Sequence, residues 1–264
     1  MSEVKLLKVE EAEKILEEGL RDFKWKIKEL PLHQCLGMYL GEDLLSPQHS
    51  DNPDADSSEA DNPEADNPEA SSLKKGQRIG PREVSLLASL GNIVVGVFEK
   101  PLVSIISLGD ELVSVIEEPD PGKVRDSNSF ALAALIQETG CDVGGVYLLG
   151  SDKNILKETL QEALNRSDLV ILSGGTDPSP QRENSITSQA IQELGNPGVL
   201  VDGLDLSHAE NSVIGIIEDT HCACCNRKSL IVGLPSDPKG VFAAYNSLID
   251  GLIKKVFFSN SEVA

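Results

Sequence analysis

Three short loops carry the residues of this chain whose types and spacing are suited to binding an anion. They are Ser107–Leu112, Ser173–Pro178 and Leu234–Pro238, and each follows a short run of branched apolar residues. Glycines in such loops allow backbone N–H groups to approach an anion such as a phosphate. The alternative is that each loop is a tight turn between a strand and a helix, with no ligand.

The polar side chains of these loops are the first candidates for a binding site. They are Asp110, Glu111, Ser173, Thr176, Asp177, Ser236 and Asp237. Open α/β sheets bind ligands outside the carboxyl ends of their strands, where such loops converge. If the preceding strands are parallel neighbours, we expect all three loops to form a single pocket at one edge of the sheet.

The segments around these loops predict alternating strands and helices. Short apolar runs predict strands at Leu102–Ser107, Val143–Leu149, Leu169–Leu172, Val213–Ile217 and Leu230–Val232. Capping residues and apolar stripes predict helices at Phe130–Thr139, Asp152–Arg166, Ser185–Leu194 and from Asp237 through Val256. This alternation indicates a three-layer α/β domain that starts at about residue 101.

The chain before residue 101 is less regular. Helices are expected at Val9–Leu20 and Pro81–Leu90, with a strand, a turn and a short helical piece ending at Gly41 within Trp25–Gly41, and a strand at Ile93–Phe98. Between them, Ser46–Ser72 contains eight acidic residues, no lysine or arginine, and no apolar residue larger than alanine apart from proline. This composition predicts a flexible acidic linker. A calcium-binding repeat is the alternative, although the segment has no glycine and four prolines.

Composition excludes several classes of partner. The 264 residues carry a net charge of −20, which argues against binding to nucleic acid or to an anionic membrane. No apolar run is long enough for a membrane helix, and the start of the chain lacks the features of a signal peptide. Five cysteines do not suggest a disulfide framework, so we expect a cytoplasmic protein.

His221–Cys225 contains a C-x-x-C and is interpreted as a hairpin turn or, alternatively, a site for a soft metal.

Several segments resemble, in order and spacing, the molybdopterin-binding domain of the MoeA family, which includes the gephyrin catalytic domain. They are Pro101–Leu112, Arg125-Asp-Ser-Asn-Ser129, Ala134–Val143, Asp168–Gly175 and Gly233-Leu-Pro-Ser-Asp-Pro238. Leu30–Gly41 and Gln77–Gly91 are similar to parts of the family's first domain. The resemblance covers nearly the whole chain outside residues 47–72.

The resemblance implies an α/β fold: a three-layer molybdopterin-binding (MogA-like) domain with a small N-terminal α+β segment. Residues 1–46 and 73–100 would form that segment, residues 47–72 a linker in place of the family's second domain, residues 101–258 the molybdopterin-binding domain, and residues 259–264 a tail. The implied activity is that of a molybdopterin molybdenumtransferase. Such an enzyme is a cytoplasmic homodimer that inserts molybdate into adenylylated molybdopterin and requires Mg²⁺.

Carried over by position, the resemblance assigns Glu111 and Asp110 as catalytic candidates. Its ligand-binding candidates are Ser107, Gly109, Asp126, Asn128, Ser173, Gly174, Gly175, Thr176, Asp177, Pro235 and Ser236. Two departures matter: Arg182 stands where the family has an Asp, and Asp205–Glu210 replaces a basic segment. A catalytically inactive carrier or regulator that binds the pterin cofactor, or a dimeric scaffold, therefore remains open as an alternative.

Overall fold

A computed structural model describes residues 6–20, 25–44, 73–176, 185–195, 197–219 and 227–259. The chain divides into two compact units. The larger unit comprises Met1–Phe23 and Lys100–Val256, and the smaller one comprises Lys24–Glu99 and Phe257–Ala264. Within the described residues, no helix is long and apolar enough to cross a membrane.

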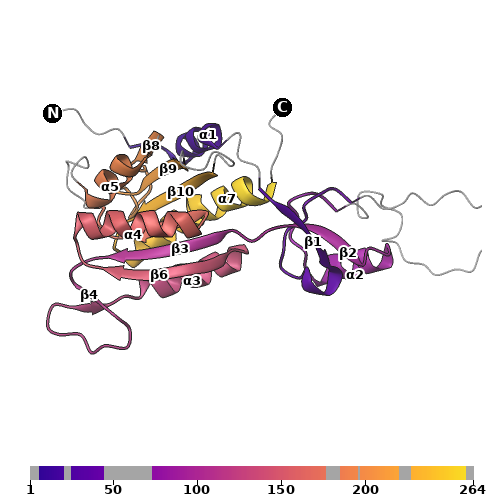
Figure 1. The fold of residues 1–264 in the computed structure, drawn as a ribbon, viewed down its shortest axis with the longest axis horizontal. Coiled ribbons are helices and arrows are strands. Elements are labelled where there is room, and N and C mark those ends of the chain that lie inside the picture. Colours follow the sequence, from indigo (N-terminus) through magenta and orange to yellow (C-terminus); the bar gives the residue numbers. More distant parts are fainter. Residues whose placement is uncertain are drawn as a thin grey trace, which may run out of the picture. The chain divides into compact units, whose positions relative to one another are not determined.

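The larger unit is built around a six-stranded sheet in the order β6-β3-β7-β10-β9-β8 (Figure 1). In chain order the strands are β3 (Leu102–Leu108), β6 (Asp142–Leu149), β7 (Leu169–Ser173), β8 (Pro197–Asp202), β9 (Val213–Asp219) and β10 (Arg227–Leu234). Strands β6, β3, β7 and β10 run parallel, whereas β9 is antiparallel to both of its neighbours. Ser107 and Leu234 both pair with Ser173, so β3, β7 and β10 end level at one edge of the sheet.

Helices cover both faces of this sheet, which confirms the predicted three-layer α/β architecture (Figure 1). One face is covered by α4 (Lys153–Arg166) and α5 (Ile186–Leu194), whose buried Leu156, Leu160 and Ile191 pack into one core with strand residues. α4 begins where predicted, because the Asp152 side chain accepts the backbone N–H groups of Asn154 and Ile155. Burying each such aliphatic side chain contributes about 2 kcal/mol to folding.

The opposite face carries α3 (Asn128–Thr139) and a helical run that starts at α6 (Pro238–Ala244) and includes α7 (Asp250–Ile253). We predicted this C-terminal run as one helix, and it is continuous, but Tyr245–Ile249 and Lys254–Ser259 are π-helical. α3 ends at Gly140, whose left-handed conformation closes the helix.

The N-terminal helix α1 (Val9–Gly19) also belongs to the larger unit. Lys255 Nζ bonds to Glu13 Oε2 at 2.7 Å and to Glu17 Oε1 at 3.1 Å, and Lys228 Nζ donates to the Gly19 carbonyl at 3.1 Å. The sequence analysis instead grouped residues 1–46 with the small N-terminal segment, which would place α1 outside the larger unit. The amphipathic pattern of α1 indicates a buried face without indicating what covers it.

Two further features of the larger unit were not predicted. β8 was missed, because Pro197 and Gly198 interrupt its apolar pattern. The short strands β4 (Leu112–Val113) and β5 (Val124–Arg125) form a separate parallel pair beside the Ser107–Leu112 loop. Because Leu112 pairs with Val124, residues 114–123 form an excursion that begins and ends beside the loop after β3.

The smaller unit contains a two-stranded antiparallel sheet of β1 (Ile27–Pro31) and β2 (Val94–Phe98), together with α2 (Pro81–Ser89). The helical piece expected to end at Gly41 is instead a 3₁₀ turn at Leu32–Gln34. The core of this unit is formed by buried apolar residues, namely Cys35, Met38, Leu40, Leu73, Ile79, Leu87, Val95 and Val97. Leu44 and Leu73 exchange two backbone hydrogen bonds of 2.9 Å, which join the two described segments of this unit.

The last aromatic residues of the chain pack on the smaller unit. The Phe258 ring stacks on Tyr39 with the centroids 4.0 Å apart, and the Phe257 ring meets Trp25 edge-on at 4.9 Å. The sequence-based division placed both phenylalanines in residues 101–258, whereas they group with the smaller unit.

Candidate functional site

The three predicted loops meet at the carboxyl edge of the sheet in the larger unit, and Asn128 joins two of them. Asn128 is the first residue of α3, and its side-chain Nδ2 donates to Ser173 Oγ at 2.9 Å and to the Ser236 carbonyl at 2.8 Å. The loops after β7 and β10 are therefore held together by one amide group. This confirms that the loops lie at one edge of the sheet, as expected for parallel neighbours.

The glycine turn after β7 adopts a conformation that requires its two glycines. Gly174 and Gly175 have φ angles of +97° and +69°, in the left-handed region that favours glycine. A Cβ at Gly174 would lie 2.1 Å from the Leu108 carbonyl oxygen, so the turn packs directly against the end of β3. The Gly174 N–H donates to the Leu234 carbonyl at 2.9 Å, which ties the same turn to β10.

Thr187 fixes this turn from α5, and sequence reasoning did not identify it. Its Oγ1 donates to the Gly174 carbonyl at 3.2 Å, and its N–H donates to the Gly175 carbonyl at 3.4 Å. The sequence feature that could have identified Thr187 is its position in the first turn of the predicted helix after the glycine turn. Thr187 therefore has a positioning role, because it holds the backbone of the turn rather than facing a ligand.

The loop after β3 carries the carboxylates of Asp110 and Glu111, which differ in their contacts. Asp110 Oδ1 accepts the Ser151 N–H at 2.8 Å, so this side chain links the ends of β3 and β6. The Glu111 side chain is exposed and folds back over Gly109, where an added Cβ would lie 2.7 Å from its Oε1. Of the two predicted catalytic residues, Glu111 therefore has the carboxylate that is more accessible to a ligand.

Asp126 lies at the same edge but stabilises a helix. Its side chain is buried, and its Oδ1 accepts the Ser129 N–H at 3.2 Å in the first turn of α3. This contact fixes the start of the helix that carries Asn128. The structure thus supports a positioning role for Asp126.

Two buried hydroxyls at this edge lack partners within the described part of the chain. Ser107 Oγ and Thr176 Oγ1 are inaccessible to solvent and make no hydrogen bond to any described residue. Buried polar atoms are normally satisfied, so such atoms next to a candidate site point to a bound ligand or water. Pro235 is buried in the loop after β10, and the predicted Asp177 lies outside the described residues.

Comparison with known proteins identifies the family. Residues 104–255 match the family model described as a probable molybdopterin binding domain. The chain belongs to this molybdopterin-binding family. It is 38% identical over 126 residues to a molybdopterin molybdenumtransferase of Staphylococcus epidermidis, covering 45% of this chain and 30% of the relative. It is 25% identical over 184 residues to one of Nostoc, covering 70% of this chain and 40% of the relative.

Solved structures share the fold over nearly the whole chain. The molybdopterin biosynthesis MoeA protein of Pyrococcus horikoshii superposes with a TM-score of 0.69 and 22% identity, covering 96% of this chain and 80% of that one. The molybdopterin-binding domain expected from the motifs is confirmed by the family match, and the MoeA protein shares the fold of the chain. The chain spans well under half the length of the curated relatives named above. Membership of the molybdopterin-binding family points to a pterin ligand.

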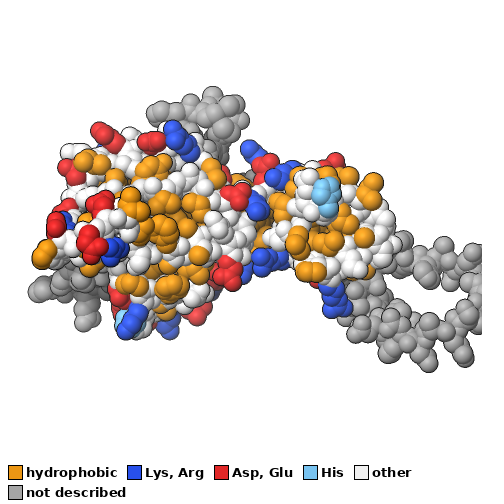
Figure 2. All heavy atoms as spheres, turned by 90° about the horizontal axis from the view of Figure 1, so that it is seen from below, with side chains coloured by type: hydrophobic (Ala, Val, Ile, Leu, Met, Phe, Trp, Pro, Cys, Tyr) orange, Lys and Arg blue, Asp and Glu red, His pale blue; other side chains and the backbone are white. Residues whose placement is uncertain are grey.

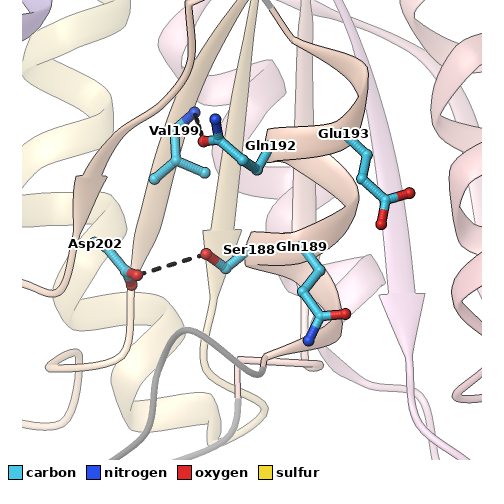
Figure 3. A pocket seen from close by; sticks show the side chains of 6 residues that line it. All are labelled: Ser188, Gln189, Gln192, Glu193, Val199 and Asp202. Atoms are coloured by element: carbon cyan, nitrogen blue, oxygen red, sulfur yellow. Dashed lines mark hydrogen bonds between the residues drawn. The ribbon is translucent and has the colours of Figure 1, made fainter.

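A separate pocket of about 470 Å³ lies between α5 and β8 of the family domain (Figure 3). It is lined by Ser188, Gln189, Gln192, Glu193, Val199 and Asp202. None of the predicted site residues lines it. Gln192 Oε1 accepts the Val199 N–H at 3.3 Å, and Glu193 bonds to Lys153 and Lys157 at 2.8 and 3.1 Å. These contacts join α5 to β8 and to α4.

Metal ligands are sparse in the described part of the molecule. No group of three or more His, Cys, Asp or Glu side chains that could hold a metal ion occurs among the described residues. The alternative metal site at His221–Cys225 lies outside them. In the loop after β3, the Glu111 carboxylate lies over Gly109, and Asp110 Oδ1 accepts the Ser151 N–H.

The face of the larger unit formed by α3 and β6 is markedly apolar (Figure 2). Phe130 on α3 is 61% exposed, and Val146 and Leu148 on the edge strand β6 are 51% and 38% exposed. Large exposed apolar patches often mark interaction surfaces. This face is therefore a candidate for contact with another protein surface.

Proposed function

We propose that the larger unit binds molybdopterin at the carboxyl edge of its sheet. We further propose that the chain acts in molybdenum cofactor biosynthesis as a molybdopterin molybdenumtransferase, inserting molybdate into adenylylated molybdopterin. The observation that carries this proposal is the pair of Asn128 hydrogen bonds, which joins the glycine turn to the Leu234–Pro238 loop. A site held together in this way is preorganised for a ligand.

Each part of the site has a distinct role in this proposal. The backbone around Gly174 and Gly175 offers a close approach to phosphate oxygens, because neither residue carries a side chain. Ser107 and Thr176 supply hydroxyls for hydrogen bonds to the ligand, and the Glu111 carboxylate faces the reacting end. These groups bind and orient the pterin, and the chemistry of molybdate insertion occurs on the ligand itself.

Magnesium also belongs to this proposal. Mg²⁺ in phosphate-binding sites is usually held by one or two carboxylates together with the phosphates of the substrate. Glu111 and Asp110 could supply those carboxylates, although Asp110 already accepts the Ser151 N–H at 2.8 Å. An adenylylated substrate would contribute the remaining oxygen ligands.

The homodimer and the cytoplasmic location complete the proposal. The exposed apolar face of α3 and β6, with Phe130 at 61% exposure, supports association with a second copy. Analytical ultracentrifugation of the full chain tests the dimer. A monomer at all concentrations would contradict it and leave the binding proposal intact.

A reconstitution assay with adenylylated molybdopterin, molybdate and magnesium tests the activity. Calorimetric titration with molybdopterin tests binding, with Asn128→Ala expected to weaken affinity about tenfold because two hydrogen bonds between the loops are lost. Asn154→Ala on the exposed start of α4 is the matched control and should bind like the unmodified protein.

The outcomes separate the proposed activity from its alternatives. Cofactor formation above background supports the transferase. Binding without cofactor formation would instead indicate a carrier or regulator, a reading that the comparisons do not favour. Absence of binding would overturn the whole proposal and leave a scaffold with the family's fold.

A further inference from the structure

The excursion between β4 and β5 brings a lysine to the candidate site. Leu112 pairs with Val124 in a parallel arrangement, so the chain leaves the loop after β3 and returns beside it. Lys123 is the residue immediately before β5, and its Nζ donates to the Asp110 carbonyl oxygen. The ammonium group therefore lies beside the loop that carries the two carboxylates predicted to be catalytic.

Lys123 differs from neighbouring cations in its partners. Arg125 bonds to Glu118 at 2.9 Å, and Lys153 bonds to Glu193 at 2.8 Å. Within the described residues, no carboxylate oxygen lies within 4.0 Å of Lys123 Nζ, and its hydrogen bond is to a neutral carbonyl. An ammonium group has three donors, so two remain for a ligand.

The glycine turn lies within reach of this ammonium group. The Leu108 carbonyl oxygen packs against Gly174, since a Cβ there would lie 2.1 Å away. Asp110 follows two residues later, a path of at most about 7 Å along the backbone. The lysine side chain is exposed and has a flexible four-carbon stem, so its head group can move towards an anion on the turn.

The charge balance of the molecule favours a cation at this site. The chain carries a net charge of −20, and Asp110 and Glu111 follow Leu108, whose carbonyl oxygen packs against Gly174. The segment Asp205–Glu210 is acidic and contains no lysine or arginine. Binding a phosphate monoester in this surrounding requires a positive group to offset repulsion, because phosphate recognition uses charge as well as backbone amides.

We propose that Lys123 binds the phosphate of the pterin ligand and makes the site selective for phosphorylated pterins. This inference rests on the proposed function and deepens it by assigning a residue for phosphate recognition. The β4–β5 pair positions Lys123 beside the loop after β3, and the lysine bridges that loop and the ligand. The selectivity of the site should then depend on one side chain that is not part of the glycine turn.

Calorimetry with two probes tests this inference. The probes are molybdopterin and the same compound after enzymatic removal of its phosphate, titrated into the full chain and into Lys123→Ala, Lys123→Arg and Lys14→Ala. Lys14 on α1 is exposed and serves as the control for losing one positive charge. Thermal melting of each variant confirms that it is folded.

We expect the unmodified protein to bind molybdopterin about tenfold more tightly than the dephosphorylated probe. Lys123→Ala should lose this preference, Lys123→Arg should retain it within about threefold, and Lys14→Ala should leave it unchanged. A full preference in Lys123→Ala, or an equal loss in Lys14→Ala, would overturn the inference. Equal binding of both probes by the unmodified protein would also overturn it while leaving pterin binding intact, whereas binding of neither probe would reject the proposed function itself.

Discussion

The two edges of the central sheet differ in how their polar groups are satisfied. At the amino edge, polar side chains bond to one another or to nearby backbone: Ser104 Oγ lies 2.6 Å from Ser167 Oγ, and Asp168 Oδ2 accepts the Leu102 N–H at 2.9 Å. At the carboxyl edge, the buried hydroxyls of Ser107 and Thr176 have no partner among the described residues.

The difference distinguishes stabilising polar groups from binding ones. Both edges contain buried serines on the same strand β3, so burial alone does not identify a site. Among the described residues, only the carboxyl edge combines unsatisfied hydroxyls with left-handed glycines and with Asn128 joining two loops. Substitutions at the amino edge should therefore lower stability, whereas those at the carboxyl edge should mainly lower ligand affinity.

The largest effect is expected for Gly174→Ala, which should abolish ligand binding and also destabilise the larger unit. The new Cβ would lie 2.1 Å from the Leu108 carbonyl at a φ of +97°, so the turn must move. We expect a loss of about 2–4 kcal/mol in the free energy of unfolding, measured by urea denaturation.

Gly122→Ala is the matched control for the backbone conformation. Gly122 has a φ of +87°, but nothing lies within 4 Å of its added Cβ, so only the left-handed strain of about 1 kcal/mol should appear. Equal losses in the two variants would show that close packing of the glycine turn against β3 is unimportant.

A smaller effect is expected for Asp168→Ala at the amino edge. The substitution leaves the Leu102 N–H without its acceptor and should lower stability by about 1–3 kcal/mol, with molybdopterin affinity unchanged. Asp142→Ala at the same edge removes only an exposed ion pair to Lys100 at 3.5 Å and should cost less than about 1 kcal/mol. Weaker ligand binding in folded Asp168→Ala would remove the distinction between the two edges.

Sequence patterns were sufficient to predict the carboxyl edge but not its internal contacts. Apolar runs at Leu102–Ser107, Leu169–Leu172 and Leu230–Val232 predicted strands, and the parallel register of these strands brings their loops together. The bond from Lys123 to Asp110 depends on β4 and β5, which are too short to produce a periodic pattern.

The packing position of α1 also could not be predicted from sequence patterns. Its apolar stripe predicts a helix with one buried face, whereas its ion pairs to Lys255 join residues more than 230 positions apart. β8 was missed for a different reason, because a proline and a glycine at its start obscure an apolar strand. Local periodicity predicts elements well, and contacts between distant segments require the folded structure.

A sharper comparison uses two serines of β3 that differ only in their edge of the sheet. Ser104→Ala removes the hydrogen bond to Ser167 and should cost about 1 kcal/mol, without altering ligand affinity. Ser107→Ala removes a buried hydroxyl with no described partner, so stability should change by less than about 0.5 kcal/mol while affinity falls. Denaturation and calorimetry on both variants measure the two quantities. A stability loss in Ser107→Ala matching that of Ser104→Ala would contradict the assignment of Ser107 to the ligand site.

The last prediction concerns the reactivity of cysteine thiols, which measures local opening of the folded protein and involves no change in its stability. Cys141 lies at the amino edge before β6, and burial raises its pKa to about 12, with neighbouring Asp142 and Asp168 adding to the shift. A raised pKa keeps the thiol protonated at pH 8, and only the thiolate reacts with iodoacetamide. Peptide mass spectrometry should therefore find Cys141 modified only in denaturant.

The carboxyl edge provides the contrasting probe. Ser236 is exposed in the loop after β10, so a thiol introduced by Ser236→Cys should react in the native protein and be protected by bound molybdopterin. Protection of this thiol by the ligand, with no change at Cys141, would place binding at one edge alone. Rapid native labelling of Cys141 would instead show that the amino edge opens, and its hydrogen bonds could then no longer be assigned a purely structural role.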